Sequence, residues 1–480
     1  MRKHMRTFLL FALLSSWLAS CAVNPVTGKR QLMLMSEADE LKLGQETDKQ
    51  VLESFGIYND PVLQKYISDL GHRMAHISHR PNLQFNFRLL DSPVINAFAV
   101  PGGYVYITRG ILAYLNSEAE LAGVMGHEIG HVAARHSAQQ YSKAKIAQIG
   151  LGVGTIVSHT FRQFSGLAQS GLGLLFLRFS RDHERQADQL GVEYSTKVGY
   201  NAYEMANFFV VLEKMDKNAD KGGLPGWLST HPNPADRVVK IHQMAKEQQA
   251  KYPGKKFVIK RNFYLNKING LVFGEDPREG YVEKNVFYHP DLRFQFPVPT
   301  GWKLQNSPSE VRMLSEDKKA AIIFKLSSQK TLAAAADKFI RDNKANVSVR
   351  EAAKASGLPA MRVISDIKTG NGRIRVQSFF IRYNDQIYVF HGYSGVGSFG
   401  DYAAVFTQTM KSFGPLTDAK KIAVKPFRIR IKKVAHKQTL EKALKAFGSD
   451  PKRLKEGGYI NGMDLTAVVK PGTLIKVIQK

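Results

Sequence analysis

Two histidines and a glutamate in the first third of the chain have the types and spacing of a zinc site. They form the run His127-Glu128-Ile129-Gly130-His131. In a helix the two imidazoles lie close together on one face, where both can reach one ion, and Glu128 lies beside that ion. A catalytic zinc site keeps one position for water and lowers its pKa to about 7. A nearby carboxylate that is not a ligand can take the proton of that water, and we assign this role to Glu128.

The surrounding sequence predicts the helix that this geometry requires. Ser117, with Glu120 three residues later, has the pattern of a capping box. Four apolar residues fall within one narrow arc of a helix: Leu121, Met125, Ile129 and Val132. We expect one helix from Ser117 to about Tyr141, with this apolar stripe against a core. Chance alone would give the pattern of two histidines with one glutamate only about 0.02 times in a chain of this length.

The third ligand has to come from a later part of the chain. A metzincin-type extension needs a glycine three residues after His131 and a histidine three residues after that, but the sequence has Ala134 and Ser137 there. His136 points off the ligand face of the expected helix. The local sequence therefore supplies two ligands and no more.

A second helix is predicted to begin in the segment Ser180–Asp188, which carries candidate carboxylates. Glu184 and Asp188 are four residues apart and so share a helix face. Beside them are small residues that allow close approach to another helix, Ala187 and Gly191. The rival ligands are Asp182 and His183. We favour Glu184 because it alone pairs with a carboxylate four residues later.

Two strands are predicted just before the metal helix. Asn96–Val100 and Tyr104–Thr108, joined by Pro101-Gly102-Gly103, have the pattern of a hairpin. An extended peptide can add to an exposed strand beside a metal, with main-chain hydrogen bonds setting its register. We expect Asn96 and Ala97 at that edge, and an ordinary structural hairpin is the alternative.

A family resemblance is carried by these motifs together with Asn96-Ala97-Phe98 and Pro101-Gly102-Gly103. They resemble the membrane-associated and periplasmic gluzincins typified by HtpX and the CAAX prenyl endopeptidases, especially the lipoprotein members. The resemblance covers about residues 22–250. It implies that Asp188 orients a ligand histidine, because a ligating imidazole normally donates its other N–H to a carboxylate or carbonyl. It also implies one zinc ion per chain with Glu128 as catalytic carboxylate and these ligands: His127, His131 and Glu184.

The segment Thr230–Arg237 is similar to the same family and offers two more candidates. His231 and Arg237 can stabilise the oxyanion of the tetrahedral intermediate. Alternatively, His231 occupies the open zinc position and holds the enzyme inactive. The sequence leaves both roles open.

The N-terminus predicts export and a lipid anchor. Residues 1–20 combine a basic start with an apolar core too short to span a bilayer, which is typical of a secretory signal. They lead into Leu18-Ala19-Ser20-Cys21, which resembles the lipobox of bacterial lipoproteins, and Cys21 is the only cysteine. We expect diacylglycerol on Cys21, a lipidated tether over 21–35, and an outer-membrane position facing the periplasm, since Ala22 stands where an Asp would favour inner-membrane retention.

The composition favours a globular protein that meets anionic surfaces. The 480 residues are 44% hydrophobic, enough for a substantial core, and the formal net charge is +27. Such a charge attracts lipid headgroups, acidic glycans or nucleic acid. The secretory N-terminus makes nucleic acid the partner we do not expect.

The second half of the chain carries no constellation with assignable chemistry. Strand-like runs and two helices predict a compact α+β domain over 285–415, of unknown role. Residues 425–480 have 14 Lys or Arg against four Asp or Glu. Their strand, helix and strand order with Asn461-Gly462 resembles a LysM module, which implies peptidoglycan as a ligand; a small basic cap is the alternative.

These observations predict an α+β multidomain protein. A mainly helical, zincin-type metallopeptidase domain with a small sheet occupies 36–260, followed by the α+β domain and the LysM-like module. The predicted function is a zinc endopeptidase, anchored to the outer membrane, that cleaves unfolded or misassembled envelope proteins. The rival is a peptidoglycan-binding envelope lipoprotein or chaperone with a non-catalytic zinc site. An intact Glu128 argues against the rival, because a structural site needs no base.

Overall fold

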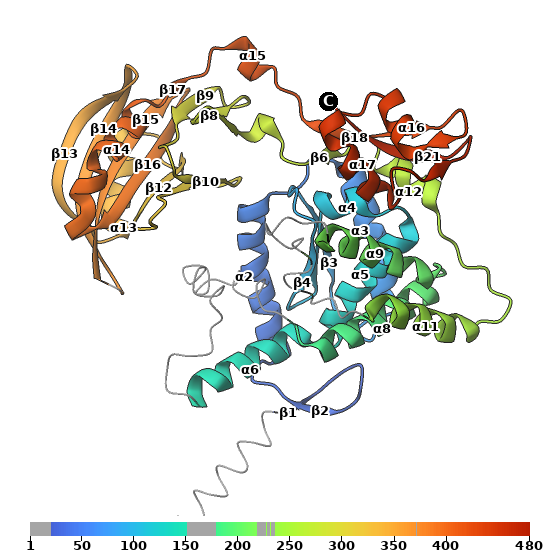
Figure 1. Cartoon of the computed structure of the whole chain (residues 1–480). Helices are drawn as coiled ribbons and strands as arrows, with labels where there is room; N and C mark the ends of the chain where they lie inside the picture. The colour runs from blue at the N-terminus through green and yellow to red at the C-terminus, as the bar shows by residue number, and fades with distance from the viewer. Residues whose placement is uncertain (1–20, 151–178, 218–226, 228–230, 232–235, 371) are drawn as a thin grey trace, which may run out of the picture. The chain divides into compact units, whose positions relative to one another are not determined.

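The computed structural model describes residues 21–150, 179–217, 227, 231, 236–370 and 372–480 (Figure 1). The predicted signal peptide, residues 1–20, lies outside the described residues. The chain forms two compact units. Unit 1 contains the described residues up to Gly274 together with Phe427–Lys480, and unit 2 is Glu275–Pro426. The α+β class predicted from the sequence is confirmed.

A three-stranded sheet in unit 1 has the order β3-β5-β4. Strands β4 (Ala97–Val100) and β5 (Tyr104–Thr108) form the predicted antiparallel hairpin, and β3 (Asn86–Leu90) runs parallel to β5. The hairpin turn needs glycine, because Gly103 has a φ of 92° and a Cβ there would lie 2.6 Å from a backbone oxygen. Because the strand order is β3-β5-β4, strand β4 lies at one edge of the sheet.

Helices cover both faces of this sheet. Helix α2 (Glu37–Phe55), capped by Ser36, packs on one face, where Phe98 and Tyr106 are buried. Helices α3 (Pro61–His76) and α5 (Glu118–Ala133) pack on the other face. Along each strand, side chains alternate between the two faces of the sheet. The side chains buried on the second face are Phe87, Leu89, Val105 and Ile107.

The metal helix ends earlier than the sequence predicted. Helix α5 begins after its cap Ser117 but stops at Ala133, and a separate helix α6 starts at His136 and runs to Gly150. Between them Arg135 has a φ of 58°, in the left-handed region. Its guanidinium lies 3.1 Å from the buried carboxylate of Glu40 and donates to the carbonyl of Met35. These contacts hold the backbone in a conformation that a continuous helix does not allow.

Helix α8 (Arg181–Lys197) crosses α5 at close range, as its small residues predicted. A Cβ on Gly126 of α5 would lie 3.1 Å from the Cα of Gly191, and one on Gly130 would lie 3.4 Å from the Cα of Ala187. Helices α9 (Met205–Lys217) and α11 (Arg237–Ala250) complete this layer. The helix crossing brings the carboxylates of α8 beside the histidines of α5.

The C-terminal segment belongs to unit 1. Strand β18 (Phe427–Lys433) pairs with β6 (Val272–Phe273) and with β21 (Leu474–Gln479). The ammonium of Lys476, fully buried, donates to the carbonyls of Ala113 and Leu115 at the end of α4 (Arg109–Tyr114). The LysM interpretation of this segment stays a prediction.

Unit 2 is built on a seven-stranded antiparallel sheet. Helix α13 (Leu332–Asp342) packs on one face, against Phe380, and α14 (Phe399–Lys411) packs on the other, against Phe390. The strands, in sheet order, are β10 (Lys303–Asn306), β11 (Glu310–Leu314), β12 (Ala320–Ser327), β16 (Gln386–Gly395), β15 (Gly372–Tyr383), β14 (Leu358–Thr369) and β13 (Asn346–Ala355). Among the described residues of both units, no helix is both long and apolar enough to cross a bilayer.

Candidate metal centre

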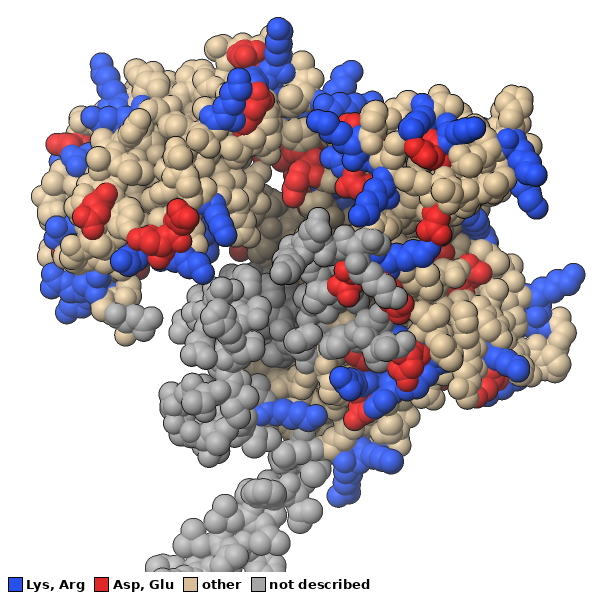
Figure 2. Space-filling view, viewed as in Figure 1, with Lys and Arg blue, Asp and Glu red and all other residues tan. Residues whose placement is uncertain are grey.

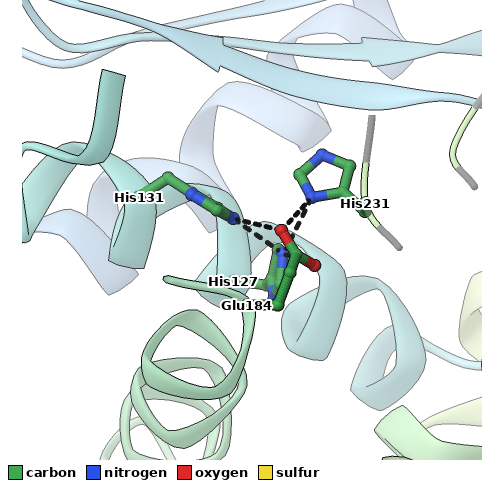
Figure 3. A group of neighbouring side chains, drawn as sticks. All are labelled: His127, His131, Glu184 and His231. Atoms are coloured by element: carbon green, nitrogen blue, oxygen red, sulfur yellow. Dashed lines mark hydrogen bonds and ion pairs between the residues drawn. The ribbon is translucent and has the colours of Figure 1, made fainter. Parts of the chain in front are cut away.

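Four side chains from three parts of unit 1 converge on one point (Figure 3). His127 and His131 extend from α5, Glu184 from the first turn of α8, and His231 from the segment before α11. One ligand atom from each lies within 4.8 Å of all the others, and all four residues are buried. The group is thus a His/His/Glu/His metal-binding group.

The contacts within the group suit a bound metal ion. The Nε2 atoms of His127 and His131 lie 3.0 Å apart, and the Nδ1 of His231 lies 3.3 Å from Nε2 of His127 (Figure 3). Lone pairs that face one another at these distances repel unless a proton or a metal lies between them. Imidazole nitrogens with one carboxylate are the donor set of zinc sites, so the residues fit this ion.

The three candidates for the third ligand lie in different places. Glu184 Oε1 lies 2.9 Å from His231 Nδ1 and 3.5 Å from His131 Nε2. Asp182 is exposed and pairs with Arg185. His183 stacks on the ring of His136 instead of pointing into the group. Only Glu184 therefore joins the group, as the spacing argument favoured.

Glu128 lies beside the group without being part of it. Its carboxylate is fully buried, and neither oxygen has a hydrogen-bond partner among the described residues. His231 Nε2 is 3.7 Å away. Burial raises the pKa of this carboxyl, because the charged form loses its hydration. A carboxylate buried without a hydrogen-bond partner is costly, so this residue is a candidate for chemistry and not for stabilising the fold.

Asp188 lies within hydrogen-bond distance of a ligand histidine and of Arg237. Its Oδ1 accepts hydrogen bonds from Nδ1 of His127 at 2.9 Å and from Nη2 of Arg237 at 2.7 Å. Burial alone would raise the pKa of Asp188, but the charge of Arg237 and the bond from His127 outweigh it and lower this pKa. With its proton on Nδ1, His127 keeps the Nε2 lone pair free for a metal.

Arg237 lies behind the ligands. It is almost fully buried, its Nη2 is 3.3 Å from Glu184 Oε2, and its guanidinium lies 4.0 Å over the ring of Phe209. It therefore contacts two carboxylates of the site, Glu184 and Asp188. Its predicted contact with an oxyanion stays a prediction.

The electrostatics differ between two of the histidines. Burial lowers the pKa of His131 well below its usual range, so this imidazole is neutral. Burial also acts to lower the pKa of His231, but the carboxylates of Glu184 and Glu128 outweigh that effect and raise it. A neutral imidazole is the ligand form, which suits His131.

Aromatic rings that the sequence reasoning missed enclose the group. The ring centroids of Phe179 and His131 are 4.0 Å apart. Trp227 stacks on His231 with 4.3 Å between ring centroids. The backbone N–H of Trp227 donates to the carbonyl of Ile95. Trp227 lies four residues before His231 in the sequence, and this nearness to a candidate ligand was the available signal.

Asn96 and Ala97 lie where β4 begins at the sheet edge. Ala97 is fully buried and pairs with Ile107 on β5. The Oδ1 of Asn96 is buried and has no hydrogen-bond partner within the described part of the chain. Ile95, whose carbonyl accepts from the backbone N–H of Trp227, directly precedes Asn96. Their role at a substrate edge stays a prediction.

Comparison with known proteins finds similarity in the region that carries this site. Residues 61–245 match the model described as Peptidase family M48. The putative beta-barrel assembly-enhancing protease of Vibrio cholerae is 32% identical over 217 residues, 44% of each chain. The beta-barrel assembly-enhancing protease of Escherichia coli K12 is 30% identical over 249 residues, 49% of each chain.

A eukaryotic relative is also similar. The mitochondrial metalloendopeptidase OMA1 of Schizosaccharomyces pombe is 28% identical over 240 residues, which are 47% of this chain and 67% of that one. The chain spans about half the length of the bacterial relatives it matches. The similarity therefore concerns one region and not the whole of each protein.

Proposed function

Starting from an M48-type peptidase domain over residues 61–245, we propose that this protein is a zinc-dependent endopeptidase. One observation carries the proposal. A buried His/His/Glu/His metal-binding group lies beside Glu128, a buried carboxylate without hydrogen-bond partners among the described residues. A site that only stabilised the fold would gain nothing from this carboxylate, whereas peptide hydrolysis needs a base there.

The side chains have separate tasks in this proposal. A zinc ion held by His127, His131 and Glu184 would supply a Lewis acid that polarises the scissile carbonyl and lowers the pKa of water. Glu128 takes a proton from the attacking water and later delivers it to the leaving amine, and its raised pKa suits this exchange. Asp188 holds His127 in the ligand tautomer. Arg237 holds the carboxylates of Asp188 and Glu184 in place.

We assign His231 an inhibitory role. Its Nδ1 belongs to the ligand group, so it takes the position that a catalytic site leaves to water. The backbone of His231 also bonds to Trp227, whose own backbone N–H bonds to Ile95 at the edge of the sheet. An extended peptide that pairs with β4 near Asn96 and Ala97 would compete with this contact. Substrate binding and release of His231 are thus linked in the proposal.

The substrates we propose are unfolded or misassembled envelope polypeptides. The names of the bacterial relatives, beta-barrel assembly-enhancing proteases, support an envelope setting. Diacylglycerol on Cys21 would anchor the chain to the outer membrane, with the site facing the periplasm. Figure 2 shows Lys and Arg side chains scattered over the visible face of both units, which suits contact with an anionic surface. We keep peptidoglycan as the proposed ligand of residues 425–480.

The proposed activity is tested by zinc content and cleavage of an unfolded polypeptide, for the wild type and for Glu128→Gln. We expect both proteins to bind zinc and only the wild type to cleave. Because cleavage of the wild type is expected to be slow while His231 is in place, the assay includes a His231→Ala protein. Zinc-loaded proteins that all fail to cleave, or a Glu128→Gln protein as active as the wild type, would reject the protease function and favour the non-catalytic rival.

A further inference from the structure

His136 lies directly behind His131, on the side away from the other ligands. The two Nδ1 atoms are 3.1 Å apart, and Nε2 of His136 lies 2.9 Å from Oε1 of Gln186 on α8. His136 is fully buried, and its ring stacks on His183 with 4.3 Å between centroids. A line of three side chains thus runs from the ligand group to α8.

The partners determine where the protons lie along this line. His131 Nε2 faces the ligand group, 3.0 Å from His127 Nε2, so its lone pair must be free when a metal binds. The proton of the ring is then on Nδ1, from where it donates to Nδ1 of His136. An imidazole that accepts at Nδ1 carries its own proton on Nε2. That proton donates to the amide oxygen of Gln186, which can only accept.

The helix break is what brings His136 to this place. On a continuous helix a residue five positions after His131 points away from it. Here α5 ends at Ala133, Arg135 takes a left-handed conformation, and α6 starts at His136. The contacts of Arg135 with Glu40 and Met35 hold the break, so the placement of His136 is built into the fold.

We propose that His136 is a positioning residue of the zinc site, which holds His131 in the tautomer that binds metal through Nε2. It serves His131 as Asp188 serves His127, but with a neutral acceptor in place of a carboxylate. The two ligand histidines are therefore oriented by different chemistry, and the acceptor behind His131 carries no negative charge. The inference rests on the proposed function in that zinc is the ion the group holds.

Zinc affinity of the purified full chain tests the inference. Removal of such an orienting partner typically costs 10–100-fold in metal affinity. We expect a loss of that size for His136→Phe, which keeps a ring but has no acceptor, and a smaller loss for His136→Asn, whose Oδ1 can accept from His131. His391→Phe in unit 2 is the matched control, since it removes a histidine bonded to Ser378 and stacked on Phe339, and it should not change zinc affinity.

Equal zinc affinity of His136→Phe and the wild type would overturn the proposal. If thermal unfolding shows that this variant is not folded without zinc, Gln186→Leu tests the outer end of the line. It should weaken zinc binding in the same direction by a smaller factor, and unchanged binding would overturn the proposal. A wild type that binds zinc but cleaves nothing would reject the protease function alone, since affinity is the readout here.

Nitrogen NMR on histidine-labelled protein gives a second readout. In the zinc-loaded wild type we expect the shared proton on Nδ1 of His131, with Nδ1 of His136 unprotonated. A proton on Nδ1 of His136 instead would contradict the proposed direction of the bond. A residue with a merely structural role would show no such preference.

Discussion

The backbone N–H of Trp227 donates a 2.9 Å hydrogen bond to the carbonyl of Ile95. Ile95 directly precedes Asn96 and Ala97 at the start of the edge strand β4. The carbonyl of Trp227 in turn accepts from the N–H of His231, whose imidazole belongs to the ligand group. Two residues that are bonded to each other thus contact the strand edge and the metal-binding group.

His231→Ala should therefore increase cleavage of an unfolded polypeptide. The substitution frees the fourth position for water and removes a link to the segment at the strand edge. We expect a rise on the order of tenfold, equivalent to about 1.4 kcal/mol. A double variant with Glu128→Gln should be inactive. A fall in activity for His231→Ala would instead support stabilisation of the oxyanion by this residue.

Asp188→Asn should weaken zinc binding about 10–100-fold. The carboxylate now accepts from both His127 and Arg237, and an amide in its place accepts less strongly and can present an N–H to His127. Zinc affinity at fixed pH measures the effect. Asp236→Asn is the control, because Asp236 is exposed and pairs only with Lys240 among the described residues. Equal affinities of the two variants would contradict the orienting role.

The local parts of the site could be predicted from the sequence, because short-range patterns determine them. The spacing of His127 and His131, the cap Ser117 and the i, i+4 pair Glu184 and Asp188 each follow from helix geometry. The structure places all these residues where that geometry requires. The hairpin of β4 and β5 was predictable for the same reason.

Other features depend on contacts between distant residues and carry no local signal. The metal helix ends at Ala133 because Arg135 pairs with Glu40, which lies 95 positions earlier. This break is also why His136, set aside as pointing off the ligand face, contacts His131. Likewise, the C-terminal segment belongs to unit 1 because Lys476 is buried against the end of α4. The composition of the segment did not indicate this contact.

Gly191→Ala should weaken zinc binding and lower the thermal stability of unit 1. A Cβ there would lie 3.1 Å from the backbone oxygen of Gly123 and 3.1 Å from the backbone nitrogen of His127, so α8 must move away from α5. We expect the free energy of unfolding of unit 1 to fall by about 1–3 kcal/mol. Gly400→Ala on α14 is the matched control, because a Cβ there meets nothing within 4 Å among the described residues. If both variants had the same zinc affinity and thermal stability, the close contact between α5 and α8 would not matter for the site.

Lys476→Met should destabilise unit 1 even though Lys476 is far along the chain from the metal-binding residues. Its ammonium bonds to the carbonyls of Ala113 and Leu115, and each carbonyl left without a partner costs about 1–3 kcal/mol. Urea unfolding followed through peptides of α4 and α5 measures the loss. Lys470→Met, at an exposed position, should leave the stability unchanged. Unchanged unfolding of α4 and α5 in Lys476→Met would show that the C-terminal segment does not support the peptidase part.

The stability of unit 2 should fall as the pH decreases from about 6.5. Burial, with a smaller contribution from Lys325, lowers the pKa of His391 to about 3, and burial lowers that of His289 to about 4. Between these folded pKa values and pH 6.5 the unfolded chain binds more protons than the folded chain. Lowering the pH therefore stabilises the unfolded state relative to the folded state. The contribution of these two histidines to the free energy of unfolding is fully present above pH 6.5. It is lost progressively as the pH falls toward their folded pKa values, by about 1.4 kcal/mol per pH unit for each fully titrating group.

His391→Leu should remove part of this pH dependence. Urea unfolding of the full chain at several pH values between 5 and 6.5, above the range where most carboxyls titrate, isolates the histidines. Hydrogen exchange in peptides of β15 and β16, corrected for the intrinsic exchange rate, reports on unit 2 alone. Leucine cannot titrate, so we expect a shallower slope whatever its effect on the absolute stability. An unchanged slope would show that His391 binds its proton equally well in the folded and unfolded states, and that its contacts with Ser378 and Phe339 do not oppose protonation.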